Sequence, residues 1–133
     1  MEDPELTAII CDRDVELFAI RDTSGTEVGM LELDFRVEGT CELSYVGLVP
    51  ELTGKGNGNW LMAQALGLAW RKSVTRVWVH TCTLDHPAAL GFYRRHGFAP
   101  YKRTVETFAD PRIAGILAPD AAPHIPCLGS LRR

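Results

Sequence analysis

The sequence lacks the features of a membrane protein, of a secreted protein, and of a small domain held together by zinc or disulfides. No apolar run approaches the ~20 residues that a membrane-spanning helix requires. The acidic start, Met1 to Glu5, has neither the basic residues nor the apolar stretch of a signal peptide. The four cysteines form no Cys-x-x-Cys pair, which argues against a zinc knuckle or a disulfide scaffold. We therefore expect a cytoplasmic protein with no membrane partner.

An excess of basic residues is also missing. The chain carries 14 Lys and Arg against 17 Asp and Glu, a formal net charge of -3. Proteins that bind nucleic acids usually show a basic balance or a basic stripe, so we expect no nucleic-acid partner. Any phosphate-containing ligand must then be bound by a small local group of residues, because the chain has no overall positive charge. With 133 residues and 46% hydrophobic content, the chain is long enough for one globular core.

The sequence does contain a regular succession of short apolar segments. Their periodicity predicts strands over 15–21, 27–35, 41–49 and 76–82, and a last strand that starts at Phe98 and covers about 101–108. Helices are predicted over 3–10, 56–72 and 87–96. We expect the long helix to bury Leu68 and Trp70 in its apolar face. This order predicts an α/β (α+β) domain with a mixed, mainly antiparallel sheet around a central strand-turn-helix-strand-helix core.

A change of composition marks the end of this core. Half of the eight prolines lie beyond Ala109. We therefore predict a core over residues 1–108 and a Pro-rich C-terminal arm over 109–133 that lies lightly structured on the surface. The one ordered possibility in the arm is a short extended piece over 113–117.

A glycine-rich turn, Thr53-Gly54-Lys55-Gly56-Asn57-Gly58, joins the third strand to the long helix. We expect the backbone N–H groups of residues 55–59 to converge at the positive end of the helix dipole, a geometry that binds phosphates. The turn is not a P-loop, because Gly56 follows Lys55 where Ser or Thr should stand. It is not a dinucleotide fingerprint, because Leu61 replaces the third glycine. A glycine-rich turn without a ligand is the alternative.

Two segments resemble the motifs of the GNAT superfamily of N-acetyltransferases. The segment 48–62 is similar to motif A, Gln/Arg-x-x-Gly-x-Gly/Ala, with Thr53, Gly56 and Gly58 at its three positions. The segment 86–98 is similar to motif B, Asn-x-x-Ala-x-x-x-Tyr-x-x-x-Gly-Phe, with His86 where Asn is usual. The resemblance covers about residues 15–108. Because Thr53 departs from the pattern, we expect the backbone amides of residues 55–59 to hold the pyrophosphate.

The resemblance implies an acetyl-CoA-dependent N-acetyltransferase whose acceptor is a small-molecule or peptide amine. It places Tyr93 as the general acid, protonated at neutral pH because the reference pKa of a phenol, about 10, exceeds that of a thiol, about 8.5. It also places a backbone N–H near Leu48 as a donor to the thioester carbonyl, with Gly47 permitting the strands to part there. The residues implied to bind coenzyme A are Leu48, Val49, Thr53, Gly54, Lys55, Gly56, Asn57, Gly58, Asn59, His86 and Tyr93.

A base must also remove a proton from the acceptor, because an aliphatic amine with a reference pKa near 10.4 arrives protonated. Glu42 on the motif A strand is the first candidate, acting directly or through water, and His80 is the second. A solvent-facing strand carboxylate is the alternative for Glu42.

Four side chains around the fourth strand are also of types that bind zinc: His80, Cys82, Asp85 and His86. His80 and Cys82 would share one strand face. We expect no metal there, because this strand is normally core in the resembled family and its side chains are satisfied inside.

The two ends depart from the family pattern. Its usual first strand and first helix have no counterpart here, and no clear final strand follows residue 108. We expect an uncovered sheet edge that pairs with a second chain, giving a homodimer. The alternative to an active enzyme is a non-catalytic CoA-binding module or a truncated remnant.

Overall fold

The computed structural model describes residues 3–129. The chain forms two compact units, of which the first ends at His80 and the second begins at Thr81. The predicted boundary between residues 108 and 109 stays a prediction.

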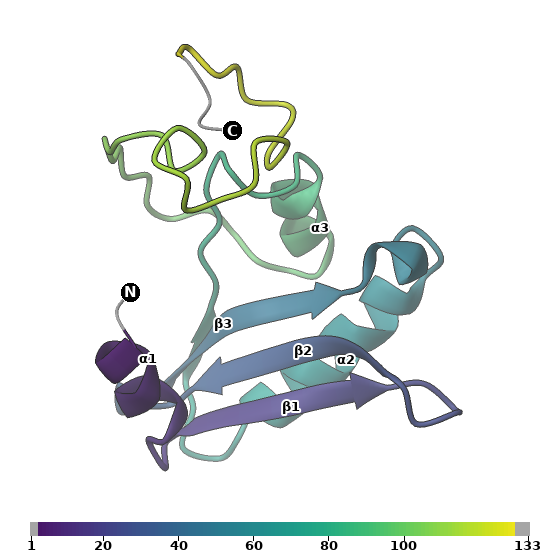
Figure 1. The fold of residues 1–133 in the computed structure, drawn as a ribbon. Coiled ribbons are helices and arrows are strands. Elements are labelled where there is room, and N and C mark those ends of the chain that lie inside the picture. The colour runs from purple at the N-terminus through teal and green to yellow at the C-terminus, as the bar shows by residue number, and fades with distance from the viewer. Residues whose placement is uncertain (1–2, 130–133) are drawn as a thin grey trace. The chain divides into compact units, whose positions relative to one another are not determined.

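The first unit is built on a sheet of four strands (Figure 1). The strands are β1 (Val15–Arg21), β2 (Glu27–Asp34), β3 (Thr40–Leu48) and β4 (Arg76–Trp78), in the order β1-β2-β3-β4. The first three pair antiparallel, and β4 pairs parallel to β3. This confirms the mixed, mainly antiparallel sheet. The strand predicted over 76–82 is much shorter, because β4 ends at Trp78.

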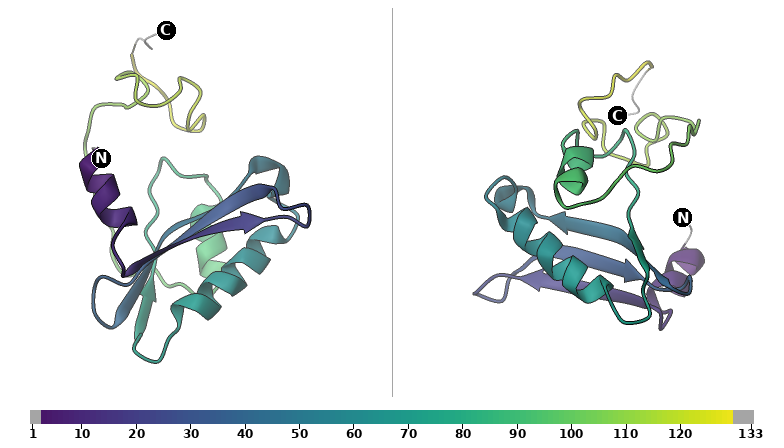
Figure 2. Two further views of the ribbon diagram at one scale, coloured as in Figure 1. Left: turned by 60° about the horizontal axis from the view of Figure 1, so that its bottom comes forward. Right: turned by 180° about the vertical axis from the view of Figure 1, so that it is seen from behind.

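The core of this unit lies between the sheet and α2 (Asn57–Ala69), which covers one sheet face (Figure 2). Alternate residues of a strand share a face, and residues four apart share a helix stripe. The side chains buried by these two periodicities are Leu31, Leu33, Cys41, Leu43, Leu61, Met62, Ala65 and Ala69. Each fully buried leucine contributes about 2 kcal/mol through the hydrophobic effect.

The prediction that the long helix buries Leu68 and Trp70 is wrong. Leu68 is 37% exposed and Trp70 is 53% exposed. Leu68 lies beside the stripe formed by residues 61, 65 and 69, and Trp70 follows the last helical residue. The other helix of the unit, α1 (Asp3–Ile10), has the predicted bounds and no buried residue.

The second unit contains α3 (Ala89–Arg95). The strand predicted from Phe98 and over 101–108 is wrong, because residues 98–110 have no regular structure. Tyr101, Val105 and Phe108 are 64%, 87% and 63% exposed. An extended segment becomes a strand only where a neighbouring strand accepts its hydrogen bonds, and the described residues place no strand beside this segment.

The C-terminal arm has no helix or strand over 109–129, as predicted, but it is more ordered than expected. It winds around Arg112, which is only 4% exposed. The guanidinium donates 2.8 Å to Asp110 Oδ2, 2.9 Å to the carbonyl of Ile125 and 3.2 Å to that of Ala121. The extended piece predicted over 113–117 is wrong, because these residues form turns and bends.

Candidate functional site

The glycine turn at the start of α2 is closed by two side chains. Before it lies the 3-10 helix η1 (Pro50–Leu52). The hydroxyl of Thr53 donates to the carbonyl of Pro50 at 2.7 Å, and the amide of Asn57 donates to the carbonyl of Leu52 at 3.0 Å. Thr53 is therefore engaged locally, and Asn57 ties the turn to η1. The only sequence signal for this hydrogen bond is the preference of Asn for turns.

Gly56 is the N-cap of α2, and it leaves the helix start open. Its φ is +82°, in the left-handed region that favours glycine, and no side chain caps the helix. The backbone ladder of α2 reaches back to its cap through the hydrogen bond from Trp60 N–H to Gly56 O at 3.3 Å. The first turn carries no acidic residue. A methyl group at Gly54 or Gly56 would meet no atom within 4 Å. Such an uncapped N-terminus suits a phosphate.

β3 and β4 part soon after they begin to pair. The parallel register covers Thr40, Cys41 and Glu42 of β3 only. Within the described part of the first unit, β3 from Leu43 to Leu48 therefore has an open edge on the β4 side.

The antiparallel ladder with β2 decides which β3 amides face this open edge. Val49 N–H donates to the carbonyl of Val28 at 2.8 Å. Because residues of an antiparallel strand alternate between bonding the neighbour and pointing away, the N–H of Leu48, opposite Gly29, points toward the open edge. The amides of Leu48 and Val49, both predicted to lie at the coenzyme site, thus point in different directions. The Leu48 N–H faces the opening, and the Val49 N–H is bonded to β2.

Gly47 lies beside this opening and makes room for an aromatic ring. A methyl group at Gly47 would lie 2.8 Å from the ring of Tyr45, which is 50% exposed. The role predicted for Gly47 in parting the strands stays a prediction.

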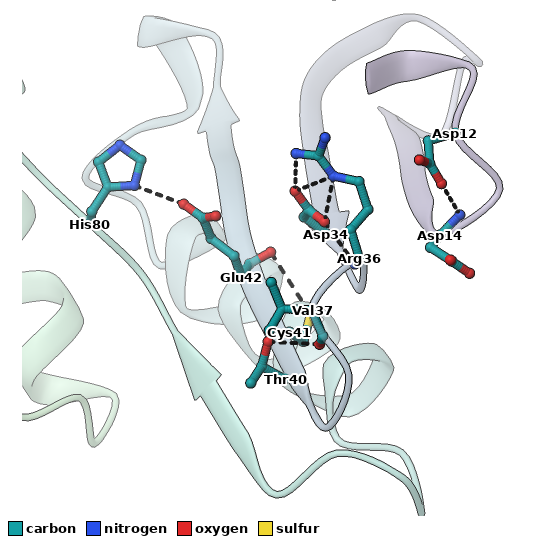
Figure 3. A network of polar contacts seen from close by, with 9 residues as sticks. All are labelled: Asp12, Asp14, Asp34, Arg36, Val37, Thr40, Cys41, Glu42 and His80. Atoms are coloured by element: carbon teal, nitrogen blue, oxygen red, sulfur yellow. Dashed lines mark hydrogen bonds and ion pairs between the residues drawn. The ribbon is translucent and has the colours of Figure 1, made fainter. Parts of the chain in front are cut away.

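The two residues proposed as alternative bases are joined to one another. His80 Nδ1 lies 2.8 Å from Glu42 Oε1 (Figure 3). The Glu42 side chain is 17% exposed and that of His80 is 71% exposed. The half-buried carboxylate can therefore orient the ring, while the ring is accessible to a ligand. His80 lies beyond the end of β4, so its predicted place on the strand is wrong.

Trp78 lies next to the Glu42–His80 pair, and the sequence analysis did not predict it as a site residue. It stands opposite Glu42 in the β3–β4 register, and its ring centroid is 6.3 Å from that of His80. The available signal was its position two residues before His80, which predicts a shared face on an extended chain.

A pocket of about 210 Å³ adjoins this corner. Glu42 and Trp78 form one side, and the others are formed by Asp34, Arg36, Val37 and Thr40. Figure 3 shows the Asp34–Arg36 pair on the far side of Glu42 from His80. Arg36 Nη2 donates to Asp34 Oδ2 at 2.6 Å, and the hydrogen bonds from Arg36 hold the pKa of Asp34 below its ordinary value.

Tyr93 lies on α3 in the second unit, with its ring against Phe92 and Phe98 at centroid distances of 5.7 and 5.9 Å. Burial raises the pKa of the Tyr93 phenol, and the negative charge of Asp85 raises it further. The hydroxyl thus stays protonated at neutral pH, as a proton donor requires.

His86 forms a turn before α3 with its own side chain and carbonyl. Its Nδ1 accepts the N–H of Ala88 at 3.1 Å, and its carbonyl accepts the N–H of Ala89 at 2.9 Å. A side-chain acceptor bonding the backbone two residues on is the turn that Asn usually makes. This explains how His can stand at the motif B position before α3.

The predicted strand face shared by His80 and Cys82 is wrong, because both follow β4. Asp85 instead builds a turn, accepting Thr81 Oγ1 at 2.6 Å and the Cys82 N–H at 3.0 Å. Across residues 3–129, no three or more side chains of His, Cys, Asp or Glu are grouped so that they could hold a metal ion. No helix in the same range is long and apolar enough to cross a bilayer.

Comparisons with known proteins bear on the fold and on the family. A search of curated proteins found no match. An aminoglycoside N-acetyltransferase in complex with CoA is similar in structure, with a TM-score of 0.63 at 15% identity over 80% of this chain and 84% of that chain. A GNAT family acetyltransferase from Elizabethkingia anophelis with acetyl-CoA bound has a TM-score of 0.64 at 16% identity, over 76% of this chain and 63% of that chain.

An acetyltransferase from Trypanosoma brucei has a TM-score of 0.60 at 17% identity, over 80% of this chain and 77% of that chain. At such identities, structural similarity shows the fold alone. The family model of the GNAT acetyltransferases matches residues 2–98, which is most of the chain. The protein is therefore a member of the GNAT acetyltransferase family.

Proposed function

We propose that this protein is an N-acetyltransferase that moves an acetyl group from acetyl-CoA to a primary amine. The observation that carries the proposal is the Glu42–His80 pair, 2.8 Å apart, at the point where β3 and β4 part. A proton acceptor oriented by a half-buried carboxylate, next to an open strand edge, suits a reaction that must deprotonate its nucleophile.

The start of α2 is proposed to hold the pyrophosphate of the coenzyme, which supplies the acetyl group as a thioester. The residues present fit this group: Gly56 leaves the helix N-terminus uncapped, and no acidic side chain in the first turn repels an anion. Thr53 is bonded to Pro50, so backbone amides and not its hydroxyl make the contact. The Leu48 N–H, directed to the open edge, is proposed to donate to the thioester carbonyl.

The proton transfers are divided between two groups. His80 is proposed to take the proton of the incoming ammonium through water. Its ring is 71% exposed while the Glu42 side chain is only 17% exposed, and six residues of β3, about 20 Å, separate Glu42 from Leu48. Glu42 holds the ring in position and stabilises the positive charge that the ring gains. Tyr93 is proposed to give a proton to the departing sulfur, because burial keeps its pKa above the ordinary value of a phenol.

Two measurements test this proposal. Titration calorimetry should show saturable one-to-one binding of acetyl-CoA, and a panel of primary amines should include one that is acetylated. Tyr93→Phe should slow the transfer and leave coenzyme affinity nearly unchanged. Absence of acetyl-CoA binding would contradict the proposal. Binding without turnover of any amine would leave the alternative, a non-catalytic CoA-binding module.

We also propose that the protein forms a homodimer and acts in the cytoplasm. The outer edge of β1 has no neighbouring strand among the described residues, and an open edge favours pairing with a second chain. A reducing compartment suits four free cysteines. A monomer mass that does not change with concentration in sedimentation would contradict the dimer.

A further inference from the structure

The outer side of α2 is exposed and carries no charge. Its exposed positions recur every three or four residues and face away from the sheet that the helix covers (Figure 2). They are Asn59, Trp60, Ala63, Gln64, Gly67 and Leu68. Trp60 is 54% exposed, and Trp70, the C-cap of the helix, is 53% exposed. No Asp, Glu, Lys or Arg stands between Asn57 and Ala69, although the outer side of a surface helix ordinarily carries charged residues.

This composition indicates a docking surface. The centre of a protein–protein interface is depleted of charged residues and enriched in aromatic ones, and tryptophan is among the residues that contribute most to binding. Single exposed apolar residues are common on any surface, whereas a contiguous uncharged face with two half-exposed tryptophans is not. The outer face of α2, defined by the residues above, therefore has the properties of an interface.

A second copy of the chain suits this face because the face is complementary to itself. Trp60 projects from it, while Gly67 leaves a gap, since a methyl group there would meet no atom within 4 Å. The two residues are seven positions apart, about 10 Å along the helix. In a two-fold contact, if residue i meets residue j, then j also meets i. Two antiparallel α2 helices would therefore place Trp60 of each copy over Gly67 of the other.

The absence of charge also favours a symmetric contact. A two-fold axis brings each part of the face against the same face of the other copy, so charged residues would meet like charges. The outer face of α2 avoids this cost. The first unit as a whole carries 13 Asp and Glu against 7 Lys and Arg, which disfavours the anionic surface of a membrane as the occupant.

The exposed area is sufficient for a reversible dimer. The two half-exposed tryptophans leave roughly 200 Å² accessible in each copy, because a whole aromatic side chain covers about 150–250 Å². With the other residues of the face, each copy offers roughly 500 Å², so a pair would bury about 1,000 Å², the lower end of specific interfaces. Such an area is typical of a complex that dissociates at micromolar concentration.

We propose that two copies of this chain associate through the outer face of α2, with the helices antiparallel and Trp60 of each copy packed against Gly67 of the other. This inference goes beyond acetyl transfer. The contact uses a different surface from the outer edge of β1, and each contact can form without the other. The same symmetry places Trp70 of the second copy opposite Asn57, so the second copy borders the glycine turn of the first.

The first test is sedimentation of the full chain between about 1 and about 200 μM, a range that brackets a micromolar dissociation constant. We expect a dimer fraction that rises with concentration. Gly67→Gln should weaken association by about tenfold or more, because the new side chain fills the gap that receives Trp60. The variant should fold, since glutamine favours a helix more than glycine does. Gly91→Gln, at an exposed glycine of α3, is the matched control and should associate like the wild type.

Three outcomes of this measurement would overturn the inference. One is a wild-type monomer over the whole range. Another is equal association of the two glycine variants, which would mean that the copies meet elsewhere, as at the outer edge of β1. The third is a monomer that binds phosphatidylcholine vesicles and loses this binding in Trp60→Gln, which would show that the face meets a membrane.

Cross-linking tests the antiparallel register. Ala63 lies close to the midpoint between Trp60 and Gly67, so in the proposed dimer it faces Ala63 of the second copy across the two-fold axis. Ala63→Cys, in a background where the three cysteines that are not buried are replaced by serine, should give a covalent dimer with a short bis-maleimide. Val105→Cys, at a position 87% exposed in the second unit, should stay monomeric. Equal cross-linking at the two positions would overturn the inference.

Discussion

Glu42 Oε1 and His80 Nδ1 lie 2.8 Å apart, although 38 positions separate the two residues in the sequence. The contact spans the last paired residues of β3 and β4, since Glu42 stands opposite Trp78 and His80 follows two residues later. It joins a carboxylate that is mostly buried to an imidazole that is mostly exposed. The two candidates that sequence reasoning ranked as competitors are therefore joined by a direct contact.

The first prediction separates the roles in this pair. His80→Ala should lower kcat by about 100-fold, because general base catalysis contributes roughly that much. Added imidazole should restore part of the rate, since the exposed position leaves room for it. Glu42→Gln should lower kcat without rescue by imidazole, and Glu38→Gln on the neighbouring loop should leave kcat unchanged. Rescue of the Glu42 variant by imidazole would contradict this assignment.

The second prediction concerns the start of α2. Gly56→Ala should destabilise the fold by about 1 to 2 kcal/mol, because a side chain in the left-handed region is strained, and it should weaken acetyl-CoA binding in calorimetry. Gly25→Ala is the matched control, since φ is +85° there and a methyl group also meets no atom within 4 Å. Both variants should lose similar stability, measured by denaturant unfolding. Similar losses of coenzyme affinity would contradict the assignment of the turn.

The third prediction concerns the protonation of Tyr93. Burial and the charge of Asp85 both raise its pKa, so its phenolate should form only above the ordinary value of 10.0. Asp85→Asn should lower the pKa toward that value, because one of the two causes is removed. Phenolate absorbance in a pH titration measures this, in a background where Tyr45 and Tyr101 are replaced by Phe. No change on removing the charge would show that Asp85 does not act on Tyr93.

The fourth prediction concerns Cys41, which is fully buried in the core of the first unit. Burial raises the pKa of its thiol from 9.0 to about 11. The folded protein should therefore alkylate at Cys11 and Cys82, which are exposed, and not at Cys41. Mass spectrometry before and after unfolding checks this.

The same shift of Cys41 has a consequence for stability. A folded-state pKa above the unfolded value gives stability that is complete below about pH 9 and is lost as the pH rises to about 11. Cys41→Ala should remove this part of the alkaline loss in denaturant titrations. An unchanged alkaline slope would contradict it.

The fifth prediction concerns the arm around Arg112. Hydrogen bonds from Arg112 lower the pKa of Asp110 from 3.8 to about 2. The resulting stability is present above pH 3.8 and is lost as the pH falls through about 2. Arg112→Met should speed hydrogen exchange at the amides of Ala114 and Ile125, which are bonded inside the arm. Arg103→Met should not, and equal exchange in both variants would show that Arg112 does not hold the arm.

Local patterns identified most of the first unit. The alternation of β2 and the four-residue spacing of Leu61, Ala65 and Ala69 each determine which face is apolar, so strand and helix positions follow from the sequence. The errors occur at predicted strands that would need a neighbouring strand to pair with. The segment 101–108, predicted as a strand, lies beside no strand in the described residues, and β4 stops after Trp78, where β3 and β4 part.

The sequence by itself determined the family, the glycine turn at the start of α2 and the residue types that can carry protons, because these depend on neighbours a few positions apart. Only the tertiary structure decided that Glu42 and His80 are one pair, that Trp78 joins them to a pocket, and that Leu48 rather than Val49 faces the open edge. The reason is that such relationships arise from strand register, and register brings together residues whose separation in the sequence carries no local signal.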